Sequence, residues 1–185
     1  MNKNLEHYVR VFNLIDSDVC VETTKQLQSV EWEKHMYRDP TNERDVTYDD
    51  DLFISNDRIS NKELLMKLTW QSFLNYIEEL ELPWLAGWHG HSEIRFNRYD
   101  VDTQMRIHCD HIHTLFDGNR KGIPVMTALG LLNNDYEGGE FIMFGDTQIN
   151  LKAGDIIVFP SNYLYPHQVN PVKSGVRYSF VSWAW

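Results

Sequence analysis

From about residue 88 to its end, the chain alternates short runs rich in β-branched and aromatic residues with turn-forming residues. Turn signals such as Gly138-Gly139 and Ser174-Gly175 separate the runs. Many short strands with no helical pattern between them indicate an antiparallel barrel or sandwich. We therefore predict a mostly β core, whose strands fall within residues 93–98, 125–132, 140–144, 155–159 and 176–183.

The first part of the chain has a different pattern, in which apolar residues recur at helical spacing. One helix is predicted from Asp16 towards Trp32, and a second from Asn61 to a stop before Pro83. Asp16 and Asn61 are residue types that cap helix N-termini, and proline ends a helix because it lacks the backbone N–H. This region is therefore expected to be helix-rich.

The polar segment 38–51 separates the two predicted helices. Its acidic composition predicts a solvated loop, or alternatively a flap over a site. We expect a single α+β domain over residues 1–185. Within it, residues 1–87 would form a helix-rich supporting region and residues 88–185 the β core.

Charge and cysteine content narrow the classes of function. The chain has 185 residues, 27 acidic and 17 basic, with a formal net charge of −10. This balance argues against binding to a phosphate backbone, which needs clustered lysine and arginine. No apolar run reaches membrane-spanning length, and no signal peptide is recognisable. With only Cys20 and Cys109 as cysteines, we expect a cytoplasmic protein that binds neither nucleic acid nor membranes.

Histidines are frequent, and one of them forms a close pair with a carboxylate. His108 and Asp110 stand at i and i+2, so on a strand they face the same way and offer two ligands side by side. His167 would complete the set from a neighbouring strand. Two imidazoles and one carboxylate, with the other positions open, form the facial triad of non-haem Fe(II) oxygenases. The sequence thus predicts a metal site at His108, Asp110 and His167.

A second polar pair, Arg177 and Ser179, follows His167 on the last predicted strand. These residues also stand at i and i+2, inside an otherwise apolar run. Arginine binds carboxylates through forked, charge-assisted hydrogen bonds. If the pair shares a face with His167, it predicts a carboxylate-binding position beside the metal.

These features together resemble the 2-oxoglutarate- and Fe(II)-dependent dioxygenases, most closely the prolyl 4-hydroxylase-like branch. The resemblance extends from about Ile94 to Trp183, which is about half of the chain. The matching pieces come in the order typical of the family: Tyr99 nine residues before His108-Cys109-Asp110, LLNNDYEGGE at 131–140, LKAGDIIVFP at 151–160, HQVNPV at 167–172 and GVRYS at 175–179.

The resemblance implies a fold and a set of binding roles. The fold would be a double-stranded β-helix, or jelly roll, with the N-terminal helices against one sheet. The three residues of the predicted metal site would bind iron. Arg177, helped by Ser179 and Tyr99, would hold 2-oxoglutarate. Asp102 stands where the family often has glycine, and Leu131 replaces a tyrosine that can contact 2-oxoglutarate.

The activity implied is hydroxylation of an unactivated C–H bond. Fe(II) would be the cofactor, 2-oxoglutarate and O2 the cosubstrates, ascorbate a reductant, and succinate and CO2 the coproducts. The substrate would be a prolyl or other residue of a peptide or protein, or else a small molecule. Trp183, Trp88 and His113 are candidates for its pocket. A groove receptive to a basic chain could be lined by Asp49–Asp51 with Trp84, Trp88, Trp183 and Trp185, or these residues could equally be core and a solvent-facing loop.

Two other interpretations remain open at this point. A cupin-type metalloenzyme could use His111, His113 and His167, with Asp117 as a carboxylate ligand. A jelly-roll module that binds sugar or protein without catalysis would need no metal at all. The first alternative leaves Arg177 and Ser179 without a role, and the second leaves every histidine without one.

Overall fold

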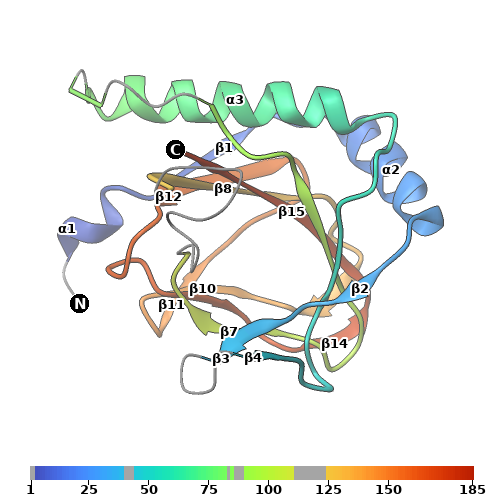
Figure 1. Cartoon of the computed structure of the whole chain (residues 1–185). Helices are drawn as coiled ribbons and strands as arrows, with labels where there is room; N and C mark the ends of the chain where they lie inside the picture. The colour runs from blue at the N-terminus through green and yellow to red at the C-terminus, as the bar shows by residue number, and fades with distance from the viewer. Residues whose placement is uncertain (1–2, 40–43, 83, 86–89, 111–123) are drawn as a thin grey trace.

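Two antiparallel sheets face each other and enclose the core of the protein (Figure 1). The computed structural model describes residues 3–39, 44–82, 84–85, 90–110 and 124–185. In sheet order, the larger sheet contains β1 (Arg10–Asn13), β12 (Asp155–Pro160), β8 (Met126–Leu131), β15 (Arg177–Ala184), β6 (Arg95–Tyr99), β5 (Phe53–Ser55) and β2 (Glu33–Lys34). The smaller sheet contains β11 (Thr147–Ile149), β10 (Phe141–Met143), β13 (His167–Val169) and β7 (Met105–His108).

Two short ribbons and three helices complete the described structure. The ribbons pair β14 (Val172–Gly175) with β9 (Tyr136–Gly138) and β3 (Tyr37–Asp39) with β4 (Arg44–Val46). The helices are α1 (Lys3–Glu6), α2 (Ser17–Gln26), which runs into a 3-10 turn at Leu27–Ser29, and α3 (Lys62–Glu79). Helices α2 and α3 lie on the outer face of the larger sheet (Figure 1). This arrangement confirms the predicted mostly β fold with helices against one sheet.

Each of the five predicted runs contains a strand, and both predicted helices form. The first helix is shorter than expected, since its α-helical part ends at Gln26. Asn61 precedes α3 without capping it through its side chain. Instead, the Asn61 amide donates a hydrogen bond to Thr23 Oγ1 at 3.0 Å. The polar contact therefore joins the two helices, whereas the sequence pattern suggested a cap within one of them.

The N-terminal region also supplies strands, which the prediction of a helix-rich support did not include. Strand β1 pairs with β12 at one edge of the larger sheet, with Arg10 opposite Val158. Strand β5 pairs with β6 on the other side, with Phe53 opposite Arg98. The sheet thus continues across the boundary expected near residue 87, because both of its outer portions come from the first part of the chain.

The segment 38–51 is not the solvated loop that its composition suggested. Part of it forms the β3–β4 hairpin, and the Asp51 side chain is fully buried. The Arg106 guanidinium binds both Asp51 and Asp50, the latter at 2.5 Å. The Asp51 carboxylate also accepts a hydrogen bond from the Tyr48 N–H at 2.5 Å. This correction has a physical reason: a buried carboxylate requires a charged partner, and the partner is distant in sequence.

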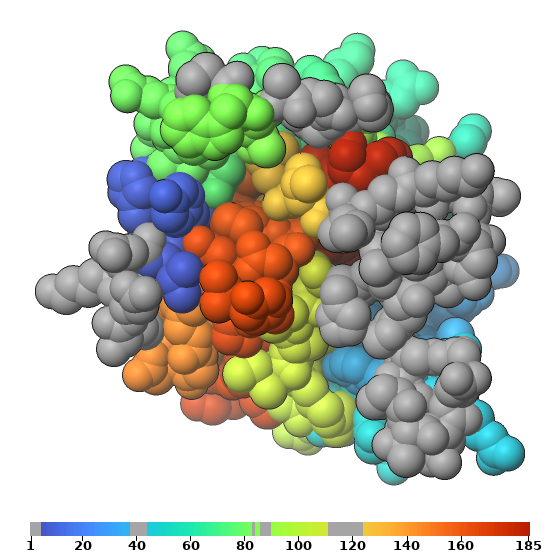
Figure 2. Space-filling view, turned by 60° about the vertical axis from the view of Figure 1, so that its left-hand side comes forward, coloured from blue at the N-terminus to red at the C-terminus, as the bar shows by residue number. Residues whose placement is uncertain are grey.

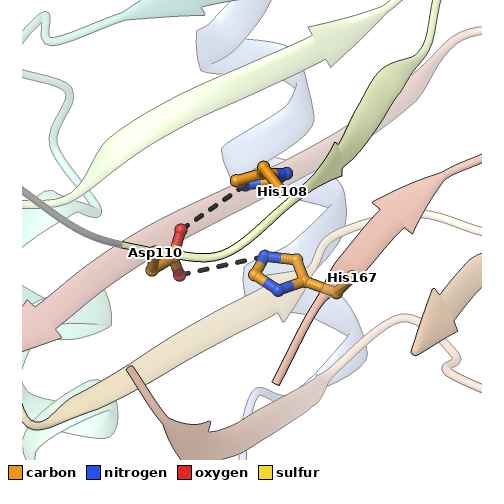
Figure 3. A group of neighbouring side chains, drawn as sticks. All are labelled: His108, Asp110 and His167. Carbon is orange, nitrogen blue, oxygen red and sulfur yellow. Dashed lines mark ion pairs between the residues drawn. The ribbon is translucent and has the colours of Figure 1, made fainter. Parts of the chain in front are cut away.

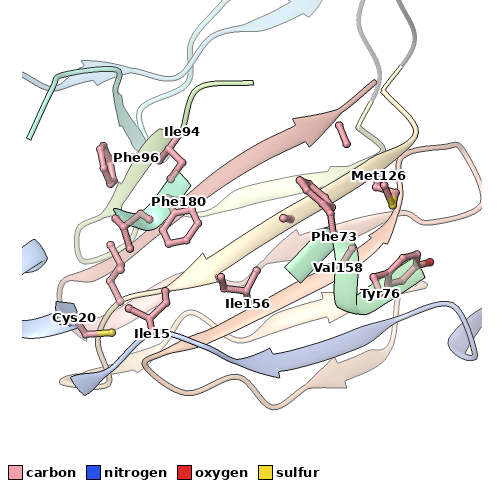
Figure 4. Close-up of a cluster of buried hydrophobic side chains, with 14 of the residues drawn as sticks. Ile15, Cys20, Phe73, Tyr76, Ile94, Phe96, Met126, Ile156, Val158 and Phe180 are labelled. Carbon is pink, nitrogen blue, oxygen red and sulfur yellow. The ribbon is translucent and has the colours of Figure 1, made fainter. Parts of the chain in front are cut away.

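A mainly apolar layer lies between the larger sheet and helices α2 and α3 (Figure 4). Phe180 and Phe96 point into it from the sheet, and Phe73 and Tyr76 reach it from α3. Gly130 is required here because a Cβ at this position would overlap the Phe180 ring. The layer fixes α3 against the sheet and supplies much of the buried apolar area.

A second cluster fills the space between the two sheets. Strands β6 and β15 contribute to both layers, because successive side chains on a strand point to opposite faces. Phe96 of β6 faces the helices, whereas Tyr99 faces the smaller sheet. Buried polar side chains also lie on this inner face, towards the smaller sheet. No helix in the described part of the chain combines the length and apolar character needed to cross a membrane.

Candidate metal centre

His108, Asp110 and His167 meet at one end of the space between the sheets (Figure 3). His108 ends β7 and lies opposite His167 of β13 in the sheet register. The Asp110 carboxylate lies 3.5 Å from His108 Nε2 and 3.8 Å from His167 Nε2. Ligands about 2.1 Å from one divalent ion and at right angles to each other lie about 3 Å apart. The three groups are therefore spaced for a shared ion, and no other such cluster occurs among the described residues.

Backbone carbonyls orient both imidazole rings. His108 Nδ1 lies 2.8 Å from the carbonyl oxygen of Arg106, and His167 Nδ1 lies 3.1 Å from that of Tyr165. In each contact a neutral ring donates its Nδ1–H, so that Nε2 keeps its lone pair. Both Nε2 atoms face Asp110. The same second-sphere arrangement orients histidine ligands in known metal sites.

Asp110 remains ionised although it is buried. Burial alone would raise the pKa of its carboxyl group, but electrostatic interaction with the imidazoles of His167 and His108 and the hydrogen bonds from His108 and Thr127 outweigh this and lower it. The Thr127 hydroxyl donates to Asp110 Oδ2 at 2.7 Å and lies 2.5 Å from the Ser161 hydroxyl. Asp110 is thus held in the charged form that binds cations.

His167 is neutral at physiological pH. Burial lowers its pKa to about 4, and the nearby Asp110 charge only partly opposes this effect. A neutral imidazole beside an ionised carboxylate is the protonation state that a metal ion requires. Asp110 and His167 are therefore both in the protonation states that metal binding requires.

A small cavity of about 20 Å³, which opens towards the surface, is lined by the three candidate ligands. Two adjacent strands form one of its walls. From β6, Arg95, Asn97 and Tyr99 are at successive inward positions, and from β15, Val181 and Trp183 are inward. The remaining lining side chains are mainly apolar: Leu52, Met105, Leu129, Phe141 and Val169.

Arg177 lies at the far end of the same strand face. It pairs in register with Tyr99, and its guanidinium lies 5.0 Å from the Tyr99 ring centroid. Arg177 Nη1 donates to Ser179 Oγ at 3.0 Å, while its buried Nε has no hydrogen-bond partner in the described structure. Arg177 itself lines a second cavity of about 170 Å³, beside Leu131 and Tyr136. The structure thus brings Arg177, Ser179 and Tyr99 together.

The two departures from the family pattern have clear positions. Asp102 has a positive φ of 65°, a left-handed conformation that glycine adopts easily and aspartate tolerates. Leu131 is buried beside Arg177, so no phenol is present at this position. The Tyr136 ring, 6.0 Å from the Arg177 guanidinium, supplies an aromatic side chain nearby.

The other candidate residues have mixed outcomes. Trp183 lines the cavity, whereas Trp88, His111, His113 and Asp117 lie outside the described residues. The proposed acidic groove is wrong for Asp50 and Asp51, because Arg106 binds both carboxylates. These acidic groups are consequently not free to attract a basic chain.

His91 belongs to the helix-facing layer and not to the cavity. It lies 2.9 Å from the Ser182 hydroxyl and stacks on Trp70.

On the molecular face in Figure 2, the orange surface that follows β12 meets the yellow-green surface at the end of β7. Cys109 Sγ donates to the Tyr163 carbonyl oxygen at 3.5 Å, and its thiol is not part of the cluster of candidate ligands.

Sequence reasoning missed Arg95, Asn97 and Thr127. A signal for the first two was present, because they precede Tyr99 by four and two residues and must share its face on a strand. Thr127 had no such signal. It reaches Asp110 only because β8 lies next to β15 and β12 in the folded sheet.

Comparison with known proteins supports the same assignment. The sequence model of the 2OG-Fe(II) oxygenase superfamily matches residues 94–185. A PKHD-type hydroxylase of Methylobacterium nodulans is 40% identical over 95 residues, which cover 48% of this chain and 41% of that protein. A PKHD-type hydroxylase of Stenotrophomonas maltophilia is 38% identical over 94 residues, with the same two shares. The chain therefore spans about two fifths of the length of these relatives.

Solved structures share the fold over nearly the whole chain. A prolyl hydroxylase of Trichoplax adhaerens, in complex with a hypoxia inducible factor peptide fragment, superposes with a TM-score of 0.70 at 19% identity, covering 100% of this chain and 84% of its own. A prolyl-4-hydroxylase of Pseudomonas putida gives a TM-score of 0.66 at 19% identity, covering 95% and 91%. These likenesses extend the match through the N-terminal region, which the family model does not reach.

Proposed function

Residues 94–185 belong to the 2OG-Fe(II) oxygenase superfamily, and from this premise we propose that the chain is a 2-oxoglutarate- and Fe(II)-dependent hydroxylase. The observation that carries the proposal is the cluster of His108, Asp110 and His167 at a cavity with buried, unpartnered polar atoms. The likeness to prolyl hydroxylases supports a prolyl or other peptide residue as the substrate. Ascorbate as a reductant remains a prediction.

The residues present fit the iron ion. Two imidazoles and one carboxylate on a single side would leave the remaining coordination positions of the ion open to the cavity. When bound, iron and 2-oxoglutarate supply an oxidant strong enough for an unactivated C–H bond, which no side chain can provide. The protein holds the ligands in place through the Arg106 and Tyr165 carbonyls and the Thr127 hydroxyl.

Arg177 would hold the distal carboxylate of 2-oxoglutarate. Its side chain is almost fully buried, no carboxylate lies within 4.0 Å of it among the described residues, and its Nε lacks a partner. A buried guanidinium without an anion is costly, and a dicarboxylate supplies the missing charge. Ser179 would add its hydroxyl, and Tyr99 would form the wall between Arg177 and the metal.

The surrounding residues would position the substrate and exclude water. Apolar side chains form most of the cavity wall, and no described residue there is placed as a general acid or base. Rate enhancement would come from holding the target C–H bond next to the metal. We therefore expect substitutions at the wall to affect substrate choice more than iron binding.

The test uses the chain under anaerobic conditions. Fe(II) and then 2-oxoglutarate are added, and the visible charge-transfer band of a chelated 2-oxo acid is recorded. We expect a band that Asp110→Ala abolishes and that requires at least about ten times more 2-oxoglutarate in Arg177→Ala. Arg98→Gln is the matched control, because Arg98 has a carboxylate partner, Asp100 at 2.9 Å, on the other face of β6.

Substrate turnover forms the second half of the test. Succinate formation is measured with a library of proline-containing peptides, and products are examined for one added oxygen by mass spectrometry. Absence of the band in iron-loaded protein would contradict the proposed cosubstrate. A band combined with turnover of free small molecules alone would retain the oxygenase and contradict the peptide substrate.

A further inference from the structure

Arg95 is a partly buried arginine that lines the cavity beside the candidate metal ligands, and the proposed function gives it no task. It points inward from β6, four residues before Tyr99, and lines the same cavity as His108 and Asp110. Its Nε is buried without a hydrogen-bond partner, and no described carboxylate lies within 4.0 Å of its guanidinium. A permanently charged group is thus directed into the reaction space without an anion of its own.

Trp183 fixes the orientation of this side chain. The Arg95 guanidinium lies 5.2 Å from the Trp183 ring centroid, and Val181 lies opposite Arg95 on β15. Contact with an aromatic face leaves the N–H groups at the edge of the guanidinium plane available. Those N–H groups form the planar fork that matches a carboxylate. Burial lowers the Arg95 pKa, although arginine remains protonated at physiological pH.

Adding the charges of the site with Fe(II) and 2-oxoglutarate bound shows that Arg95 would lack a counter-ion. The two positive charges of Fe(II) and that of Arg177 balance the Asp110 carboxylate and the two carboxylates of 2-oxoglutarate. Arg95 then remains as one uncompensated positive charge in a largely apolar cavity. Such a charge is unfavourable unless an anionic group enters with the substrate.

Resting on the proposed function, we infer that Arg95 is a specificity-determining residue that binds a carboxylate of the hydroxylated substrate beside the metal. The carboxylate could be the α-carboxylate of an amino acid or peptide end, or an acidic side chain next to the target residue. Asn97 lies between Arg95 and Tyr99, and its buried Oδ1 has no described hydrogen-bond partner. It is placed to accept a hydrogen bond from an N–H of the same ligand.

The experiment measures binding of matched probes, so it does not depend on turnover. Each probe is titrated by calorimetry into anaerobic protein loaded with Fe(II) and 2-oxoglutarate. N-acetyl-L-proline is compared with N-acetyl-L-prolinamide, and acetyl-Pro-Glu-amide with acetyl-Pro-Gln-amide. The first pair tests an α-carboxylate and the second an acidic side chain. In at least one pair, we expect the carboxylate probe to bind roughly ten- to a hundred-fold tighter than its neutral partner.

Variants assign this discrimination to one side chain. Arg95→Gln should reduce the preference for the carboxylate to less than about two-fold, and Arg95→Lys should retain part of it because the charge remains. Arg98→Gln should leave the preference unchanged, since Arg98 packs between Trp32 and Phe53 on the opposite face. In all three variants, the 2-oxoglutarate requirement of the charge-transfer band should match that of the parent protein.

Three results would overturn the inference. The first is that neither probe pair is discriminated although the charge-transfer band forms. The second is that the preference for the carboxylate probe persists in Arg95→Gln. The third is that Arg95→Gln raises the 2-oxoglutarate requirement of the band in the absence of a probe. The last result would assign Arg95 to the cosubstrate. Absence of the band in the parent protein would instead contradict the proposed function itself, so the two failures are distinguishable.

Discussion

The two faces of strands β6 and β15 have opposite characters although they share one backbone. Towards the helices, Phe96 and Phe180 join a closed apolar layer. Towards the smaller sheet, Arg95, Asn97 and Arg177 present buried polar atoms that lack partners in the described structure. On the first face Arg98, whose Nε also lacks a hydrogen-bond partner, is paired with Asp100, whereas the two arginines of the second face have no carboxylate within 4.0 Å among the described residues. Stability and function are therefore assigned to opposite sides of the same strands.

Truncation on the helix-facing side should have the largest effect. Phe180→Ala removes a fully buried aromatic ring between the sheet and α3, and we expect it to lower the free energy of unfolding by about 3–5 kcal/mol. Val181→Ala, on the inner face, should cost only about 1.5 kcal/mol because fewer methyl groups are lost. Chemical denaturation measures both. Equal losses would show that the two layers contribute alike.

Substitution of a candidate metal ligand should show the reverse pattern. Asp110→Asn should weaken Fe(II) binding by more than about a hundred-fold, because the charged ligand is lost. Without metal, we expect the unfolding free energy to fall by about 1–3 kcal/mol, less than in Phe180→Ala, because Asn keeps an oxygen that can accept the Thr127 hydrogen bond but loses the charge. Metal titration and denaturation are run on the same preparations. A large loss of stability with intact iron binding would reverse the comparison.

A smaller effect is expected where the apolar layer has no spare space. Gly130→Ala places a Cβ within the Phe180 ring, and overpacking of this kind costs about 1–3 kcal/mol. Gly145→Ala is a suitable contrast, because a Cβ there meets no atom within 4 Å, although its φ of 89° adds backbone strain. Thermal denaturation compares the two. If Gly130→Ala recovers full stability in a Phe180→Leu background, steric overlap is confirmed as the cause.

The pH dependence of the unfolding free energy tests the pKa of a buried histidine near the cavity. Burial, with the charges of Arg95 and His108, lowers the pKa of His35 to about 3. Its unfolded value is about 6.5, so the unfolded chain binds the additional proton between these limits. Stability from neutral His35 is thus complete above pH 6.5 and is lost as the pH falls. Between pH 6.5 and pH 5 this amounts to about 2 kcal/mol.

His35→Phe should remove that part of the pH dependence. His167 and His91, whose pKa values burial also lowers, still contribute in the variant. The unfolding free energy is measured from pH 7.5 to pH 5 in the parent and in the variant. Identical slopes in both proteins would assign the acid sensitivity to the other histidines.

The sequence predicted where the helices and strands form better than it predicted which parts of the chain pack against each other. Strands such as 155–160 and the helix 62–79 were found because local apolar periodicity reports burial. The His108/Asp110 pair was recognised because spacing of two on a strand is sufficient to place two ligands together. By contrast, segment 38–51 was predicted as a solvated loop because its composition contains no information about Arg106.

What the sequence determined by itself is the strand pattern, the ligand types and, through the resemblance, the family. The tertiary structure alone decided which polar groups share one cavity. Arg95 and Trp183 are 88 residues apart in the chain, and they meet because β6 pairs with β15. Thr127 reaches Asp110 through the folding of β8 into the same sheet. Alternation along a strand fixes which residues share a face, but only the pairing of strands determines which faces enclose a site.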